Sequence, residues 1–139
     1  MTMQEYAARQ TSALLERLAQ QIARTSELPD DEAIHDLRVT IRRLSRCLRV
    51  FGAFYPGKSW KKLRRRLADL MDAAAAVRDL DIARELLVKA GLSPRSAAIM
   101  HLSRERANRS RALLAEVRRW QGREINQWNR KLELPSWTS

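Results

Sequence analysis

The sequence is poor in the residues that stabilise strands, disulfides and membrane spans. Its 139 residues include one cysteine, four glycines, four prolines and 6% aromatics. A single cysteine, Cys47, excludes an intramolecular disulfide and fits a reducing compartment, so we expect a cytoplasmic protein. No apolar run approaches the roughly 18 residues of a transmembrane helix, and the N-terminus lacks the apolar region of a signal peptide. We therefore expect no membrane partner.

Catalytic and metal-binding motifs are also missing. The sequence has no glycine-rich phosphate loop before a lysine, no H-E-x-x-H and no paired cysteines. Asp79 and Asp81 are two positions apart on an expected helix, so their carboxylates diverge and do not form a magnesium site. We expect no catalytic residues, no metal ion and no cofactor, and hence a binding protein rather than an enzyme.

Alanine, leucine, arginine and glutamate dominate the chain and favour helices. Breakers at Pro29, Pro56-Gly57, Gly91 and Pro94 predict helices over about 3–25, 31–55, 59–77, 79–90 and 93–131. Asp30 or Asp31 is expected to cap the second helix, Ser59 the third and Ser93 the fifth, and one interpretation of Asp79 makes it the cap of the fourth. The short connections predict an all-α, antiparallel up-and-down bundle of about five helices with a long C-terminal helix. One domain over residues 1–132 and a frayed tail over 133–139 are expected.

The long last helix has a consequence for assembly. About 38 residues at roughly 1.5 Å each give about 57 Å, far longer than the first two helices. Trp120, Ile125 and Trp128 would then lie beyond the bundle, and such an uncovered apolar face predicts a partner chain, a homodimer through the C-terminal helix. The alternative is a break at Gly122, after which the chain folds back.

Positive charge is concentrated in one segment. The net charge is +11, and residues 35–66 hold eleven basic side chains but one acidic one, Asp36, whereas the rest of the chain holds 16 and 15. On a helical wheel the following residues fall within about 80° of one another, beside a separate apolar face: His35, Arg38, Arg42, Arg46 and Arg49. We call these five residues the basic stripe.

The next helix carries Lys58, Lys61, Lys62 and Arg65 on one face of its first two turns. Cations repel each other and the dipole at a helix N-terminus, and a bound anion would offset that cost. The alternative is a merely solvated face, but such faces usually alternate charge signs at i,i+4, which is not the case here. A row of arginines suits a linear chain of phosphates, and also one strand of a nucleic acid.

Two motifs resemble the CHAD family, the conserved-histidine α-helical domain. They are HDLRVTIRRLSRCLRVF at residues 35–51 and VRDLDIA at residues 77–83. The resemblance, which covers about residues 5–120, implies a basic helical module that binds inorganic polyphosphate and is often associated with triphosphate-tunnel enzymes. It implicates His35, Arg38, Arg42 and Arg43 in the first motif and Arg78 and Asp79 in the second, although Arg78 and Asp79 are equally well explained as structural. Arg49 and the lysines after it would extend the surface.

The sequence departs from the family pattern at three points. Ser45 stands where an arginine is frequent, alanines occupy positions 73–76 where a glycine is common, and only the first of two usual helical halves is matched. A second copy would complete the groove, or the site is an open half. The expected polyphosphate-binding residues are His35, Arg38, Arg42, Arg43, Arg46, Arg49, Lys58, Lys61, Lys62, Arg65 and Arg78. The alternatives are a nucleic-acid-binding protein and a docking module for an acidic protein partner.

Overall fold

The computed structural model describes residues 1–134, except for the side chain of residue 123. This part of the chain is helical throughout and has no strand. Its elements are α1 (Met3–Glu27), α2 (Asp31–Phe51), the short η1 turn (Gly52–Phe54), α3 (Ser59–Lys89), α4 (Ala97–Arg119), the π-helical turn η2 (Trp120–Glu124) and α5 (Ile125–Lys131). The all-α prediction is confirmed.

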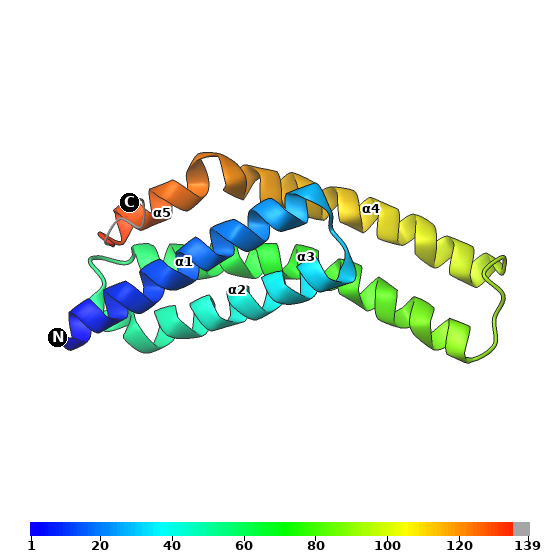
Figure 1. Ribbon diagram of the computed structural model, residues 1–139, viewed down its shortest axis with the longest axis horizontal. Helices are drawn as coiled ribbons and strands as arrows, with labels where there is room; N and C mark the ends of the chain where they lie inside the picture. The colour runs from blue at the N-terminus through cyan, green and yellow to red at the C-terminus, as the bar shows by residue number, and fades with distance from the viewer. Residues whose placement is uncertain (135–139) are drawn as a thin grey trace.

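The helices form an antiparallel bundle with a projecting arm. α1 packs on α2, α2 packs on α3, and α4 returns along α3 and contacts α1. The last part of α3 and the first part of α4 extend together beyond α1 and α2, whereas α5 continues past the bend at η2 toward the end that holds the N-terminus (Figure 1). The functional surface described below lies on α2 and the first half of α3.

The apolar face of α2 is buried as its periodicity predicts. Ile34, Leu37, Ile41, Leu44 and Leu48 are at most 2% exposed. Asp30 caps this helix, because its side chain accepts a hydrogen bond from the backbone N–H of Ala33 at 2.8 Å. A helix with one face fixed in the core leaves the rest of its surface accessible to solvent, and the basic stripe lies there, beside the buried face.

The prediction of a break between the third and fourth helices is wrong. α3 runs without interruption through residues 73–79, so Asp79 lies inside a helix and caps nothing. The alanines at positions 73–76 are the best helix formers, and no glycine or proline interrupts them. α3 ends at Gly91, as expected: its φ is +92°, and Leu92 and Gly91 donate to the carbonyls of Leu87 and Val88 in a Schellman motif. At its start, Ser59 is the first helical residue rather than the cap.

The prediction of one long C-terminal helix is also wrong. The structure shows the alternative, a break at Gly122. α4 begins at Ala97, capped by Ser96 rather than Ser93, and ends at η2, where Gly122 has a non-helical ψ of −111°. The chain bends there and α5 packs on α1, so Trp120, Ile125 and Trp128 are 0%, 7% and 5% exposed within one chain. The uncovered apolar face that predicted a homodimer through this helix does not exist.

The hydrophobic core continues to the last residues that the structure describes. Leu132 and Leu134 are 2% and 8% exposed and belong to the core, so packing continues beyond residue 132. The remainder of the expected tail, residues 135–139, lies outside the described residues. Within residues 1–134, no helix combines the length and apolarity that crossing a bilayer requires.

Candidate anion-binding site

The turn between α2 and α3 fixes how these two helices face each other. A Cβ at Gly52 would lie 2.6 Å from Cζ2 of Trp60, so only glycine allows the indole to approach this closely. Gly57 has a φ of +59°, a left-handed conformation that glycine adopts without strain. These two glycines let α3 return beside α2 and bring the basic residues of both helices together.

The basic stripe is assembled as the sequence predicts. His35, Arg42, Arg46 and Arg49 are exposed, and Arg38 is partly buried. From the first to the last of them, α2 rises about 21 Å. The predicted alignment of these five side chains on one face of α2 is therefore confirmed, while their ligand stays a prediction.

A groove of about 200 Å³ lies between α2 and α3. Four of its five lining residues are arginines, and none is acidic: Arg42, Ser45, Arg46, Arg49 and Arg64. We call this feature the α2–α3 groove. Like charges gathered around a hollow raise the local potential and attract anions. The chemistry of the groove is thus that of a site for phosphate, sulfate or carboxylate groups.

Arg64 was missed by sequence reasoning, which selected Lys58, Lys61, Lys62 and Arg65 on α3 instead. The wheel places Arg64 apart from those four, about 40° from Trp60. Trp60 faces α2 at Gly52, and Arg64 follows it by one turn on the same side. The only signal in the sequence was that Arg64 lies four residues after Trp60, on the same side of the helix. This spacing predicts that Arg64 faces α2 only when Trp60 is known to pack against α2.

Two arginines of this surface have buried nitrogen atoms without a partner. Nε of Arg38 and Nε of Arg64 are inaccessible to solvent and make no hydrogen bond within the described residues. An unsatisfied buried donor costs about 1–3 kcal/mol, and the large majority of such groups in proteins are paired. Arg38 belongs to the basic stripe and Arg64 lines the α2–α3 groove, so both covered atoms belong to side chains of the candidate site.

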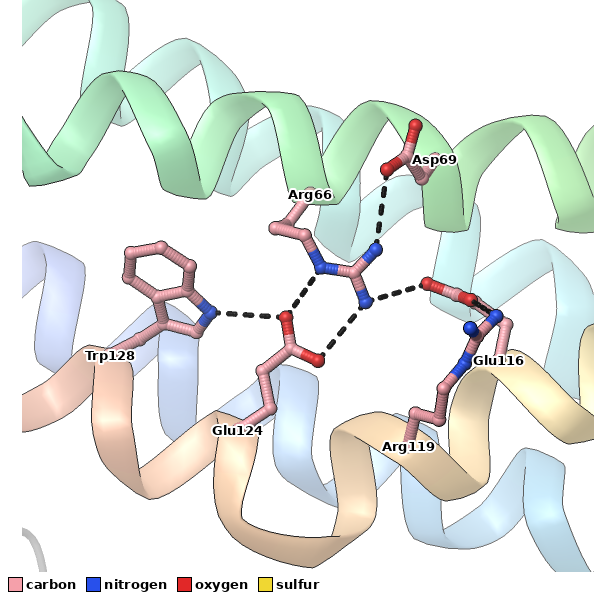
Figure 2. Close-up of polar contacts among 6 residues, drawn as sticks. All are labelled: Arg66, Asp69, Glu116, Arg119, Glu124 and Trp128. Atoms are coloured by element: carbon pink, nitrogen blue, oxygen red, sulfur yellow. Dashed lines mark hydrogen bonds and ion pairs between the residues drawn. The ribbon is translucent and has the colours of Figure 1, made fainter.

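The carboxylates of the protein neutralise other arginines. Arg66 donates to Glu124 at 2.6 and 3.0 Å, to Glu116 at 2.8 Å and to Asp69 at 3.2 Å (Figure 2). The hydrogen bond to Glu124 is the main reason that the pKa of Arg66 rises above its ordinary value, with burial opposing the rise. Arg119 contacts Glu116 in the same cluster.

Two further arginines are neutralised in the same way. Arg24 bonds Asp36 at 2.7 Å, which turns that carboxylate toward α1 and away from the stripe. Arg106 bonds Asp81 at 2.6 Å. In contrast, no residue of the basic stripe forms an ion pair with a carboxylate of residues 1–134. The cations of the basic stripe are therefore left without a carboxylate partner in the described part of the chain.

The other predicted site residues do not all join the groove. Arg43 lines hollows between α1 and α2 instead. Lys62 and Arg65 line a different hollow, next to Arg66 and Trp128. Lys58 and Lys61 are exposed, and Nζ of Lys61 lies 5.5 Å from the ring centroid of Trp60.

Arg78 has a partner of its own. Its guanidinium lies 3.8 Å from Oε1 of Glu85. This ion pair agrees with the structural interpretation, one of the two that the sequence left open for Arg78. The single predicted patch is thus resolved into the α2–α3 groove and several separate cations.

A family model for the CHAD domain matches residues 6–138, nearly the whole chain. This chain belongs to the CHAD family. CHAD domains are known as modules that bind polyphosphate and are associated with triphosphate-tunnel enzymes. The match extends past residue 120, where the resemblance of the two motifs ended. No curated protein and no solved structure matches this chain. In this CHAD domain, the first motif forms α2 and the second lies within α3.

Proposed function

We propose that this CHAD domain binds inorganic polyphosphate in the α2–α3 groove and along the basic stripe, without catalysing a reaction on it. The observation that supports this proposal best is the lining of the groove: four arginines from two helices, with no acidic residue. The basic stripe supports it further, because none of its residues forms an ion pair with a carboxylate of residues 1–134.

The geometry of the surface suits an extended polyanion. Each guanidinium can donate two parallel hydrogen bonds to one phosphate group. From Arg38 to Arg49, α2 rises about 16 Å, so a linear chain that follows the helix would meet one arginine after another. Binding would release the counterions of several phosphates, and the affinity should fall steeply as salt is added.

The groove is less suited to nucleic acid. Proteins that bind single strands usually stack bases on aromatic side chains, and readers of duplexes offer amides to base edges. Ser45 is the only uncharged residue in the lining, so the groove supplies phosphate contacts but neither an aromatic ring nor an amide. An acidic protein partner would satisfy the same arginines and is separated from polyphosphate by experiment.

The experiment is a binding titration with fluorescently labelled long-chain polyphosphate and two double variants of equal charge. The first, Arg42→Glu with Arg49→Glu, changes two exposed residues of the groove. The second, Arg104→Glu with Arg109→Glu, changes two exposed residues of α4. We expect the groove variant to lose about 100-fold or more in affinity, because two charge-assisted contacts at about 1.4 kcal/mol or more each are removed.

The control variant measures the effect of net charge alone. It should lose only a few-fold in affinity, and both variants should keep the circular dichroism of the parent. Equal losses in the two variants would contradict a site in the groove. Displacement of polyphosphate by DNA at equal phosphate concentration would favour the nucleic-acid alternative, and release of orthophosphate would refute a purely binding role.

A further inference from the structure

A second hollow lies on the other side of α2, between this helix and α1. Its volume is about 240 Å³. Its lining combines apolar and cationic residues: Tyr6, Gln10, Leu14, Arg43, Arg46, Cys47, Val50 and Phe51. We call it the α1–α2 groove. Arg46 lines this groove and the α2–α3 groove alike, so the two sites meet at one side chain.

The apolar part of the α1–α2 groove is held in place by aromatic contacts. The rings of Tyr6 and Phe51 meet edge to face, with 5.9 Å between their centroids, and Phe54 lies 6.4 Å from Phe51. Yet Tyr6 is 45% exposed and Val50 is 62% exposed. An apolar surface gathered in a hollow and left in contact with water gains free energy when a partner covers it.

The polar part of the lining favours a ligand with negative charge. Arg43 and Arg46 are exposed, and neither forms an ion pair with a carboxylate in the described part of the chain. No acidic residue lines the groove. A ligand that complements both halves must carry an apolar group close to one or more anionic groups.

We propose that the α1–α2 groove is a docking site for a short acidic segment of a partner protein. One large apolar side chain of that segment packs against Tyr6, Val50 and Phe51. Carboxylates beside it bond to Arg43 and Arg46. This pattern, an apolar anchor in a pocket surrounded by charge pairs, is how a few residues supply most of the affinity at protein interfaces.

The size and shape of the groove favour a peptide segment over the other candidates. Pockets for whole small molecules usually measure about 300–1,000 Å³, so about 240 Å³ fits a single side chain better than a cofactor. A hollow between two helices also receives a protruding side chain, and the vesicle measurement below separates such a segment from a surface of anionic lipid.

The shared Arg46 couples the two sites. A guanidinium that bonds polyphosphate in the α2–α3 groove offers fewer donors to a carboxylate in the α1–α2 groove, and two anions beside one arginine repel each other. The partner segment and polyphosphate should therefore weaken each other's binding, by the same factor in both directions.

The thiol of Cys47 provides the readout. It is the only cysteine of the chain and is partly buried in the lining of the α1–α2 groove. The probes are blocked peptides with Trp, Phe or Leu between two pairs of glutamates. We expect at least one of them to slow modification of Cys47 by a maleimide in a saturable manner. Exchange of its apolar residue for Ala, or of its glutamates for Gln, should weaken protection about tenfold or more.

Variants locate the effect on the protein. Val50→Ser and Tyr6→Ser should each reduce peptide affinity about tenfold, while Val50→Ser leaves polyphosphate affinity unchanged. The matched controls are Val88→Ser and Met100→Ser, which alter residues of the arm that are 46% and 48% exposed. They should leave peptide binding as it is.

Four results would overturn the proposal. One is the absence of protection by all three peptides. Another is an equal loss of affinity in the Val88→Ser control. The third is tighter binding to vesicles of anionic lipid than to any peptide, lost in Val50→Ser, which would assign the surface to membranes. Last, peptide affinity that saturating polyphosphate does not change would refute the sharing of Arg46.

Discussion

Nε of Arg66 donates to Oε1 of Glu124 across 2.6 Å and so ties α3 to the π-helical turn that ends α4 (Figure 2). The side chain of Arg66 is 29% exposed and that of Glu124 is 20% exposed, so the pair is partly shielded from water. Nε1 of Trp128 lies 3.5 Å from the same carboxylate oxygen. The contact thereby joins the ion-pair cluster around Arg66 to the segment that follows the bend at Gly122.

We predict that Glu124→Gln lowers the free energy of unfolding by about 1–2 kcal/mol, because Arg66 loses its main charged partner but keeps Glu116 and some access to water. Urea unfolding measures the change. Glu32→Gln is the control: its carboxylate lies 3.5 Å from Arg24 but is 79% exposed, so its effect should stay below about 0.5 kcal/mol. Equal effects in the two variants would show that Glu124 does not hold the turn.

Arg64→Gln should weaken polyphosphate binding about tenfold, since a charge-assisted contact contributes roughly 1.5–3 kcal/mol. It should also reduce the slope of log affinity against log salt by about one, as loss of one phosphate contact requires. The measurement is a titration at several salt concentrations. Arg84→Gln, which removes an exposed arginine later on α3, should change neither quantity. An unaltered slope in Arg64→Gln would remove this residue from the site.

Gly52→Ala should disturb both folding and binding. The added Cβ would lie 2.6 Å from the indole of Trp60, so α2 and α3 must move apart, and overpacking of this kind costs about 1–3 kcal/mol. The matched variant is Gly91→Ala, which introduces strain at a φ of +92° on the arm, far from the groove. Both variants should melt at lower temperature, but Gly52→Ala alone should lose polyphosphate affinity. Normal binding by Gly52→Ala would show that the α2–α3 spacing is unimportant.

Tyr55 makes the fold sensitive to high pH. Burial raises the pKa of its phenol above the ordinary value of about 10, with the hydroxyl of Thr11 as its hydrogen-bond partner. The folded state thus holds this proton more tightly than the unfolded state does. The resulting stability is present below about pH 10 and is lost as the pH rises through the higher folded-state pKa.

Tyr55→Phe should therefore flatten the loss of stability in the alkaline range, and it should cost about 1 kcal/mol at neutral pH because Thr11 loses its partner. Thermal melts over a pH series provide the stability, and phenolate absorbance reports the titration. An unchanged alkaline profile in the variant would assign the sensitivity to other groups.

The helical class, the buried face of α2 and the alignment of the basic stripe could be read from the sequence. Each depends on the angle between residues of one helix, which the helical period fixes without knowledge of any neighbour. The cap at Asp30 and the helix end at Gly91 likewise depend only on residues that are close to them in the sequence. The break before Asp79 was misplaced, because four alanines favour a continuous helix and no glycine or proline stands between residues 73 and 79.

The sequence alone thus determined which side chains share a helix face and how much positive charge that face carries. Only the tertiary structure decided which helix lies on each side of α2: α3 brings Arg64 to Arg42, Arg46 and Arg49, whereas α1 separates Arg43 into another groove. It also decided that the chain bends at Gly122 and buries Trp128 itself. The physical reason is that neighbours far apart in sequence are chosen by packing of whole apolar faces, and helical periodicity carries no information about that choice.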